Sequence, residues 1–247
     1  MDIVRTALGS TGFLVGWLYL DKVSMATDEE IRLRAIAYIK ANKKLIKKEF
    51  ADPLLYPKSE HPVAVFMSGS PGAGKTEISK QLVKIFDEPT VRIDADEIRK
   101  LLPGYTGSNA SLFQGAAALG VEKVLDSCIE RSQSFILDGL LADSAKAQHN
   151  IQRCLDHGFE VIILYVYQKP ELAWNFTQIR EKVEGRNISR EVFIHGLIES
   201  RSVAQQVKDT FGSYVRLFVL KKDYENGVQK VWEDVKKISD LIETRVN

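Results

Sequence analysis

The sequence predicts an α/β fold with a central, mostly parallel five-stranded sheet flanked by helices, and an N-terminal helical extension. Short, nearly continuous apolar runs alternate with amphipathic segments from Val63 onward, as expected of parallel strands that helices cover on both faces. A glycine-rich loop directly follows the first of these runs. The 247 residues, with ordinary apolar and glycine content, suit one large domain or one domain with an appendage.

Residues 1–60 are predicted to be the N-terminal extension, and residues 61–247 the main domain. The run from Thr27 to Glu30 is a capping box, and apolar residues follow it at helical spacing, so an amphipathic helix is expected here. Three prolines between Ala51 and Pro62 indicate a connecting segment. The sequence leaves open whether Met1 or Met25, just ahead of the capped helix, is the true start.

The main domain is predicted to contain five strands with helices between them. The predicted strands cover residues 63–69, 91–94, 134–139, 160–167 and 214–220. The predicted helices cover residues 74–86, a short segment after 94, 111–132, 142–157, a segment that begins at Pro170, and 188–211. Proline is favoured at the first helical position. A final amphipathic helix is expected over residues 226–243.

Composition excludes several classes of partner. The net charge of +1 gives no general attraction to nucleic acid or to an anionic membrane. The longest early apolar run, Phe13 to Leu20, is far shorter than the roughly 18 residues of a membrane span. Cys128 and Cys154 match no metal-ligand spacing and are read as small core residues of a reducing compartment. A cytoplasmic protein without nucleic-acid or membrane partners is therefore expected.

The segment GSPGAGKT fits the pattern G-x-x-x-x-G-K-[ST]. Its glycines let backbone N–H groups face phosphate oxygens, and the following helix adds its positive end. Lys75 is expected to reach the β and γ phosphates, and Thr76 to offer its hydroxyl to Mg²⁺. The motif therefore predicts a P-loop NTPase or kinase fold that binds ATP or GTP with Mg²⁺. The predicted nucleotide-binding residues are Gly69, Ser70, Pro71, Gly72, Ala73, Gly74, Lys75 and Thr76.

Acidic residues end two of the predicted strands. Asp94 and Asp96 follow the second strand, at the edge where open α/β sheets bind ligands. A carboxylate there can accept the proton of an attacking hydroxyl, and Asp96 is the better placed of the two. The residue alone leaves open whether Asp96 instead caps the next helix. Asp138 ends the third strand, where an acid can hold Mg²⁺ or orient an acceptor.

Arg180 and Arg186 lie on a polar segment between two predicted helices. Guanidinium groups suit the charge that spreads over a transferring phosphoryl group, and small kinases carry such residues on a lid. Ordinary solvated charge on a helix surface is the alternative for either residue. The N-K-x-D motif typical of a GTPase switch does not occur. Transfer of phosphate to a bound acceptor is therefore favoured.

Four segments together resemble the zeta-toxin family, including PezT-like proteins: MSGSPGAGKTEISK, VRIDADEIRK, FILDGLLAD and IREKVEGRNIS. The resemblance covers about residues 62–220. It implies a kinase that transfers the γ-phosphate of ATP or GTP, with Mg²⁺, to the 3′-hydroxyl of the amino sugar of UDP-N-acetylglucosamine, which blocks peptidoglycan synthesis.

The resemblance also implies roles for individual residues. Asp96 corresponds to the catalytic base, Lys75 to the phosphate-binding lysine, and Arg180 and Arg186 to the arginines that stabilise the transition state. Asp94 and Asp138 are expected to contact the substrate, with Asp138 and Thr76 at the metal. The family's E-G-T element reads Asp-Gly-Leu here, so a related UDP-sugar is an alternative acceptor.

A helical antitoxin silences toxins of this family, so the resemblance implies such a partner in trans. Residues 27–50 offer an alternative, a tethered inhibitory helix in cis, because a linked inhibitor acts at high effective concentration. A helix that packs on the outer surface of the domain competes with this reading. Two other functions stay open: another metabolite or polynucleotide kinase, and a nucleotide-gated regulatory protein without catalysis.

Overall fold

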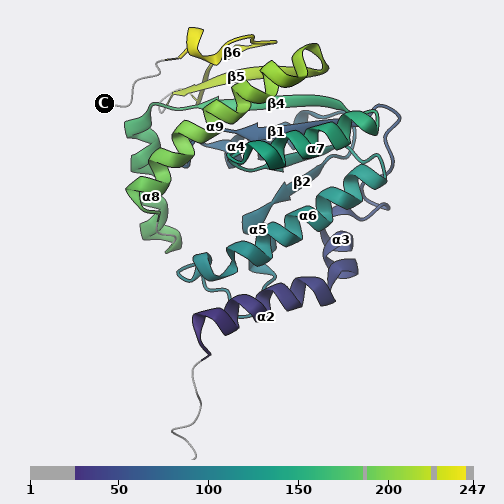
Figure 1. The fold of residues 1–247 in the computed structure, drawn as a ribbon, viewed down its shortest axis with the longest axis vertical. Helices are drawn as coiled ribbons and strands as arrows, with labels where there is room; N and C mark the ends of the chain where they lie inside the picture. The colour runs from purple at the N-terminus through teal and green to yellow at the C-terminus, as the bar shows by residue number, and fades with distance from the viewer. Residues whose placement is uncertain (1–25, 186–187, 224–226, 243–247) are drawn as a thin grey trace, which may run out of the picture.

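The computed structural model describes residues 26–185, 188–223 and 227–242 (Figure 1). The strands are β1 (Val63–Ser68), β2 (Val91–Asp94), β3 (Phe135–Asp138), β4 (Glu160–Tyr167), β5 (Val215–Asp223) and β6 (Gly227–Trp232). The α-helices are α2 (Asp28–Ala41), α3 (Lys43–Ala51), α4 (Lys75–Ile85), α5 (Ala95–Lys100), α6 (Gln114–Glu130), α7 (Ser144–Asp156), α8 (Pro170–Glu184) and α9 (Arg190–Phe211). Short 3-10 helices are η1 (Ala110–Phe113), η2 (Gly212–Tyr214) and η3 (Ile238–Asp240).

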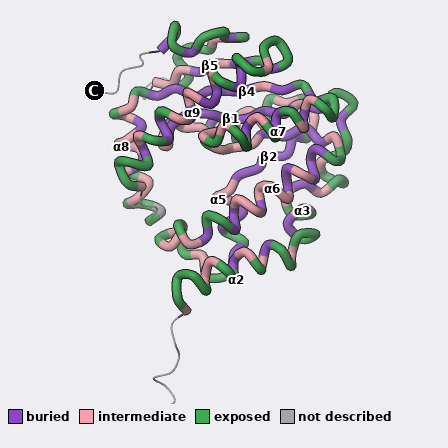
Figure 2. Tube along the Cα trace, viewed as in Figure 1, coloured by how far each residue is buried: buried purple, intermediate pink, exposed green. Residues whose placement is uncertain are grey.

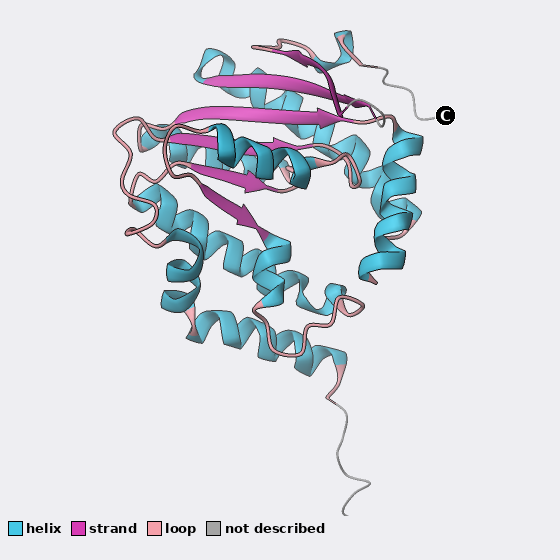
Figure 3. Ribbon diagram, turned by 180° about the vertical axis from the view of Figure 1, so that it is seen from behind, coloured by secondary structure: helices cyan, strands magenta, loops and turns pink. Residues whose placement is uncertain are grey.

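The strands form one sheet in the order β2-β3-β1-β4-β5-β6. The first five strands are parallel, and β6 runs antiparallel to β5. The parallel strands therefore end at the same edge of the sheet (Figure 3). There the segment after β1 lies beside the ends of β3 and β4, and the register pairs Asp94 directly with Asp138.

Helices cover both faces of the sheet, as the alternation of apolar runs predicted. Ala64 and Phe66 of β1 belong to the larger core, with residues of α2, α3, α6, α7 and α9. Their neighbours Val65 and Met67 face the smaller core with Ile78 of α4, because successive strand residues point to opposite faces. Buried residues concentrate along the strands and the inner sides of the helices (Figure 2). The predicted α/β fold is confirmed.

The expected final helix over 226–243 is wrong. Residues 227–232 form β6, and η3 follows as a single short turn. The open edge of β5 offers backbone hydrogen bonds to this segment, and pairing with it outweighs the weak helical spacing of the sequence. Trp232 then packs against the larger core. The sheet consequently has a sixth strand, and the β5–β6 hairpin extends past the carboxyl end of the parallel strands.

The capped N-terminal helix is confirmed, but the helical segment is divided into two helices. Thr27 Oγ1 accepts a hydrogen bond from Glu30 N at 3.2 Å, and Glu30 Oε2 accepts one from Thr27 N at 2.9 Å. A break at Asn42 separates α2 from α3. Both helices pack against α6, and their buried residues share the larger core with the strands. The division into an extension and a main domain at residue 60 stays a prediction.

Two expectations about the ends concern residues outside the described part of the chain. The choice between Met1 and Met25 as the start falls there, as does the apolar run Phe13 to Leu20. Within the described residues, every helix is too short or too polar to cross a bilayer. Cys128 and Cys154 are both buried free thiols of the larger core, as predicted.

Candidate functional site

The phosphate loop joins the end of β1 to the start of α4, as the motif requires. Gly69 has a φ of 137°, and a Cβ atom there would lie 2.3 Å from the carbonyl oxygen of Val166 on β4. Only glycine allows this backbone to turn against the neighbouring strand. The first turn of α4 begins at Lys75, so the positive end of the helix points at the loop. The loop is therefore shaped as an anion cradle.

Lys75 folds back over the loop that precedes it. Its Nζ donates hydrogen bonds to the carbonyl oxygens of Gly69 and Ser70, both at 2.8 Å. The pKa of Lys75 is lowered to about 8, chiefly by burial; the charge of Asp138 opposes this shift, and the charge of Arg180 contributes to it. The ammonium is thus within electrostatic range of residues from β3 and α8. A polyphosphate in the cradle would favour the charged form and raise the pKa of Lys75.

A group of charged and polar side chains, which we call the inner cluster, consists of Ser79, Arg92, Asp94 and Asp138. Arg92 Nη2 donates to a carboxylate oxygen of Asp94, and to Asp138 Oδ2 at 2.7 Å. Ser79 Oγ on α4 donates to the same Asp138 oxygen at 2.8 Å and accepts from Arg92 Nε at 2.8 Å. The cluster therefore joins β2 and β3 to the helix that carries the phosphate loop.

Asp94 also caps α5. Its Oδ1 accepts a hydrogen bond from the backbone N–H of Asp96 at 2.8 Å. Burial raises the pKa of Asp94, with the charge of Asp138 adding to the rise and the cap and Arg92 opposing it. The capping role that the sequence left open for Asp96 thus belongs to Asp94. The substrate contact predicted for Asp94 stays a prediction.

A second group, the outer cluster, consists of Asp96, Arg99 and Arg180. Asp96 Oδ2 accepts a hydrogen bond from Arg180 Nη2 of α8 at 2.8 Å. Its other oxygen accepts from Arg99 Nη1, which is one turn further along α5. Side-chain exposure is 23% for Asp96 and 42% for Arg180, but only 4% for Arg99. The fold therefore brings Asp96 and Arg180 together although they lie 84 positions apart.

Sequence reasoning missed two positively charged members of these clusters. Arg92 stands inside the short strand β2, between Val91 and Ile93, two positions before Asp94 and hence on the same face. A charge inside a parallel strand was the available signal, because such strands are covered on both faces. Arg99 is almost fully buried and also donates to Gln114 of α6. Arg186 lies outside the described residues, so its predicted role stays a prediction.

The predicted magnesium ligands suit a metal that arrives with nucleotide. Among the described residues no three acidic, histidine or cysteine side chains gather as a metal site. Mg²⁺ usually keeps several waters and takes one or two protein ligands beside the phosphates. Thr76 at the start of α4 and Asp138 at the end of β3 are a hydroxyl and a carboxylate of this kind. The donor set fits the ion, and its binding here stays a prediction.

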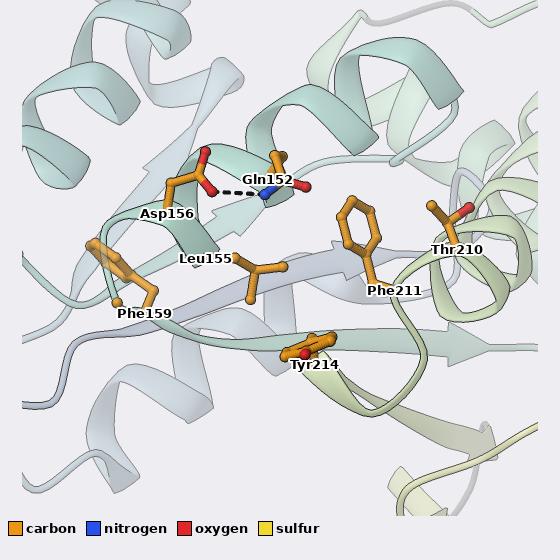
Figure 4. A pocket seen from close by; sticks show the side chains of 8 residues that line it. Gln152, Leu155, Asp156, Phe159, Thr210, Phe211 and Tyr214 are labelled. Carbon is orange, nitrogen blue, oxygen red and sulfur yellow. Dashed lines mark hydrogen bonds between the residues drawn. The ribbon is translucent and has the colours of Figure 1, made fainter.

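A separate pocket of about 620 Å³ lies at the amino ends of β4 and β5 (Figure 4). Its lining includes the side chains of Leu155, Phe159, Phe211 and Tyr214, and its Asp156 carboxylate is engaged by Gln152 Nε2 at 2.7 Å. The phosphate loop follows the carboxyl end of β1, on the opposite edge of the parallel sheet. This hollow therefore lies away from the phosphate loop.

The fold and the phosphate cradle are those of a P-loop nucleotide-binding protein. The family model described as Zeta toxin matches residues 47–231, so the chain belongs to the Zeta toxin family. Among curated relatives, Toxin PezT of Streptococcus pneumoniae is 27% identical over 49% of this chain and 51% of its own length. The ATP-dependent protease ATPase subunit HslU of Caldicellulosiruptor saccharolyticus is 25% identical over 77% of this chain and 40% of its own length. The chain thus spans about half or less of these relatives.

Solved structures show the same fold. The PezAT toxin–antitoxin system of Streptococcus pneumoniae includes a chain similar to this one with a TM-score of 0.62 at 19% identity, covering 79% of this chain and 80% of that one. A chain of the AvrRxo1-ORF1:-ORF2 structure with ATP reaches a TM-score of 0.55 at 15% identity, covering 94% of this chain and 73% of that one. At these identities the likeness concerns the fold alone.

Proposed function

We propose that this protein is a kinase that transfers the γ-phosphate of ATP or GTP to a hydroxyl of UDP-N-acetylglucosamine or a related UDP-sugar. One observation carries the proposal: the Asp96 carboxylate lies beside Arg180, and Arg180 acts electrostatically on Lys75 of the phosphate loop. A base, a cation beside it and a phosphate cradle are parts that phosphoryl transfer uses. Membership of the Zeta toxin family supports the class of reaction.

In the proposed reaction, Asp96 accepts the proton of the acceptor hydroxyl. The freed oxygen forms a bond to the γ-phosphorus, the bond from that phosphorus to the β-γ bridging oxygen breaks, and ADP or GDP leaves with the electron pair. Lys75 and Arg180 stabilise the charge on the equatorial oxygens. Mg²⁺, held through Thr76 and Asp138, would neutralise charge on the phosphates.

Arg180 has two places to bind in this scheme. It contacts Asp96 Oδ2 in the structure, and the transferring phosphoryl group would attract the same guanidinium. Because both side chains are partly exposed, their ion pair contributes little to stability, and the exchange costs little. Nucleotide binding would therefore draw Arg180 to the phosphate and release one oxygen of Asp96 for the acceptor hydroxyl.

The proposed partner is an antitoxin in trans. PezAT is described as a toxin–antitoxin system, and the similarity to it supports such a partner here. Inhibition in cis by residues 27–50 has less support, because the main neighbours of α2 are α6 and η1, and α3 also packs on α6. These two helices lie on the outer side of α6 (Figure 1). Blocked peptidoglycan synthesis would follow from consumption of the UDP-sugar.

The test is incubation with ATP or GTP, Mg²⁺ and a panel of UDP-sugars, with mass spectrometry for the addition of one phosphate. We expect a phosphorylated UDP-amino sugar with the wild-type protein and none with Lys75→Ala. A product on another metabolite, or on polynucleotide ends, would replace the UDP-sugar assignment. If no acceptor is phosphorylated while ATP binds, a nucleotide-gated regulatory protein becomes the better reading.

A further inference from the structure

Lys222 reaches the phosphate loop from β5, which lies two strands away from β1 in the sheet. Lys222 lies near the carboxyl end of β5. Gly74 has a φ of 87°, and a Cβ atom there would lie 2.2 Å from Lys222 Nζ and 2.9 Å from its Cδ. The ammonium therefore rests against the backbone of the last loop glycine, where α4 begins. Even alanine at position 74 would displace this side chain.

The β5–β6 pairing is irregular beside Lys222. Lys221 pairs with Lys230 and Lys222 pairs with Val228, so the register shifts between Lys221 and Lys222 and the extra residue, Gln229, is in β6. A bulge re-aims the side chains beside it, and bulges are common next to active sites. The sixth strand, which the sequence did not predict, therefore pairs with β5 at the residue that reaches the loop.

The charge of Lys222 is only weakly engaged by protein groups. Among the described residues, its charge partner is Glu77 Oε2 at 3.9 Å, beyond hydrogen-bond distance. The Glu77 side chain is 66% exposed, whereas that of Lys222 is only 19% exposed. A long contact to a solvated carboxylate gives little stabilisation. A half-enclosed ammonium at the start of α4 is therefore available to an anion in the cradle.

The order of the strands indicates which phosphate this is. The inner cluster includes the ends of β2 and β3, on one side of β1, and the outer cluster lies just beyond β2. Lys222 approaches from β5, on the other side. Lys75 of such a loop serves the β and γ phosphates, while the loop backbone holds the α and β phosphates. With the acceptor side at β2 and β3, the nucleoside end of the polyphosphate lies toward β5.

We infer that Lys222 binds the α-phosphate of nucleoside di- and triphosphates held by the loop. The inference rests on the proposed function, because the direction of the polyphosphate is taken from it. The identity of the acceptor does not affect the inference. Lys222 would then be a nucleotide-binding residue supplied by the hairpin, in addition to the contiguous motif.

The test compares the affinities of the full-length protein for ATP and for ADP by titration calorimetry, without any acceptor. Lys222→Met keeps the alkyl chain and removes the charge, and we expect about tenfold weaker binding of both nucleotides. Lys222→Arg should keep affinity within about threefold, since it keeps the positive charge. Lys221→Met, on the neighbouring residue, should bind as the wild type does. Thermal melting without nucleotide checks that each variant is folded.

Several results would overturn the inference. Unchanged affinity in Lys222→Met rules out a phosphate contact, and a loss for ATP alone would assign the contact to the γ-phosphate instead. For Glu77→Gln we expect a nucleotide affinity at least equal to that of the wild type. If Glu77→Gln instead loses affinity as Lys222→Met does, then Lys222 acts only by pairing with Glu77. If Lys222→Met does not fold, the folded variant Lys222→Arg decides the question. A loss of nucleotide affinity in Lys222→Arg would contradict the inference.

The outcome is separable from that of the proposed function. A protein that binds ATP through Lys222 but phosphorylates no UDP-sugar would retain the inference and reject the proposed acceptor. The converse result is that Lys222→Met phosphorylates the UDP-sugar and binds nucleotide as the wild type does, while Lys75→Ala loses nucleotide affinity. That result would reject the inference and retain the kinase.

Discussion

The inner and outer clusters are both built from aspartates and arginines beside the phosphate loop, but they differ in their access to water. In the inner cluster the side chains of Asp94, Asp138 and Arg92 are 8%, 5% and 14% exposed. In the outer cluster, Asp96 and Arg180 are exposed to 23% and 42%. The first is therefore a fixed support, and the second is able to exchange partners.

The physical reason is the cost of leaving a buried charge alone. Removal of one partner from a buried pair costs several kcal/mol, whereas an exposed pair contributes about 0–1 kcal/mol. Arg180 can consequently leave Asp96 for a phosphate, while Arg92 cannot leave Asp94 and Asp138. Chemistry is assigned to the outer cluster and positioning to the inner one. The predictions below test this assignment, from the largest expected effect to the smallest.

Asp96→Asn should lower kcat by about 10²–10⁴-fold, because an amide cannot accept the hydroxyl proton. Affinity for ATP should stay within about threefold, which separates a catalytic from a binding defect. Steady-state kinetics and calorimetry measure the two quantities. The matched control is Glu97→Gln, the adjacent residue, which pairs with Lys100 on the surface. Equal activity of Asp96→Asn and the control would remove the base from the outer cluster.

Arg92→Met should lower the free energy of unfolding by about 3–5 kcal/mol, since it leaves Asp94 and Asp138 buried without their cation. Denaturant titration measures this loss. Burial raises the pKa of Asp94, so this carboxylate takes up a proton more readily in the folded protein, and the deficit should shrink as pH falls. The control Arg153→Met breaks a more exposed pair with Asp126 and should cost about 1 kcal/mol or less. A similar small cost for both variants would refute the contrast.

Arg180→Met should lower kcat by about 10²–10³-fold, because the guanidinium of Arg180 stabilises charge that develops in the transition state. The free energy of unfolding should change little. Combined with Asp96→Asn, the loss should be smaller than the sum of the two free energies, since both residues act on the same step. Lys182→Met, on the same helix, is the control. A large loss of stability with normal kcat would move Arg180 into the supporting group.

The pH dependence of ATP binding should report both clusters through Lys75. Phosphate favours the charged ammonium, so binding raises its pKa from about 8 and takes up a proton. Affinity should be full below pH 8 and fall at higher pH, by at most about tenfold per unit. Arg180→Met should move the fall to higher pH, and Asp138→Asn to lower pH, because these two charges shift the pKa of Lys75 in opposite directions. Calorimetry in several buffers measures the affinity and the protons; no shift in either variant would contradict the electrostatic link.

Parts of the site could be predicted from the sequence because their contacts are local. The carbonyls that Lys75 binds lie five and six positions before it, and the capping box at Thr27 spans three residues. Asp96 and Arg180 were each singled out in the sequence, but their pairing was not predicted, because the two residues lie 84 positions apart. Arg92 was missed although Asp94 lies only two positions away, because its other partners, Ser79 and Asp138, come from α4 and β3.

The sequence by itself determined the order of strands and helices from β1 to β5, the phosphate loop and its glycines, since local spacing and backbone conformation decide these. Tertiary structure decided which acids meet which arginines, that Asp94 rather than Asp96 caps α5, and that residues 227–232 pair with β5 instead of forming a helix. The free energy of those choices comes from burial and from hydrogen bonds between distant segments. Such contacts exist only once the sheet has brought the segments together.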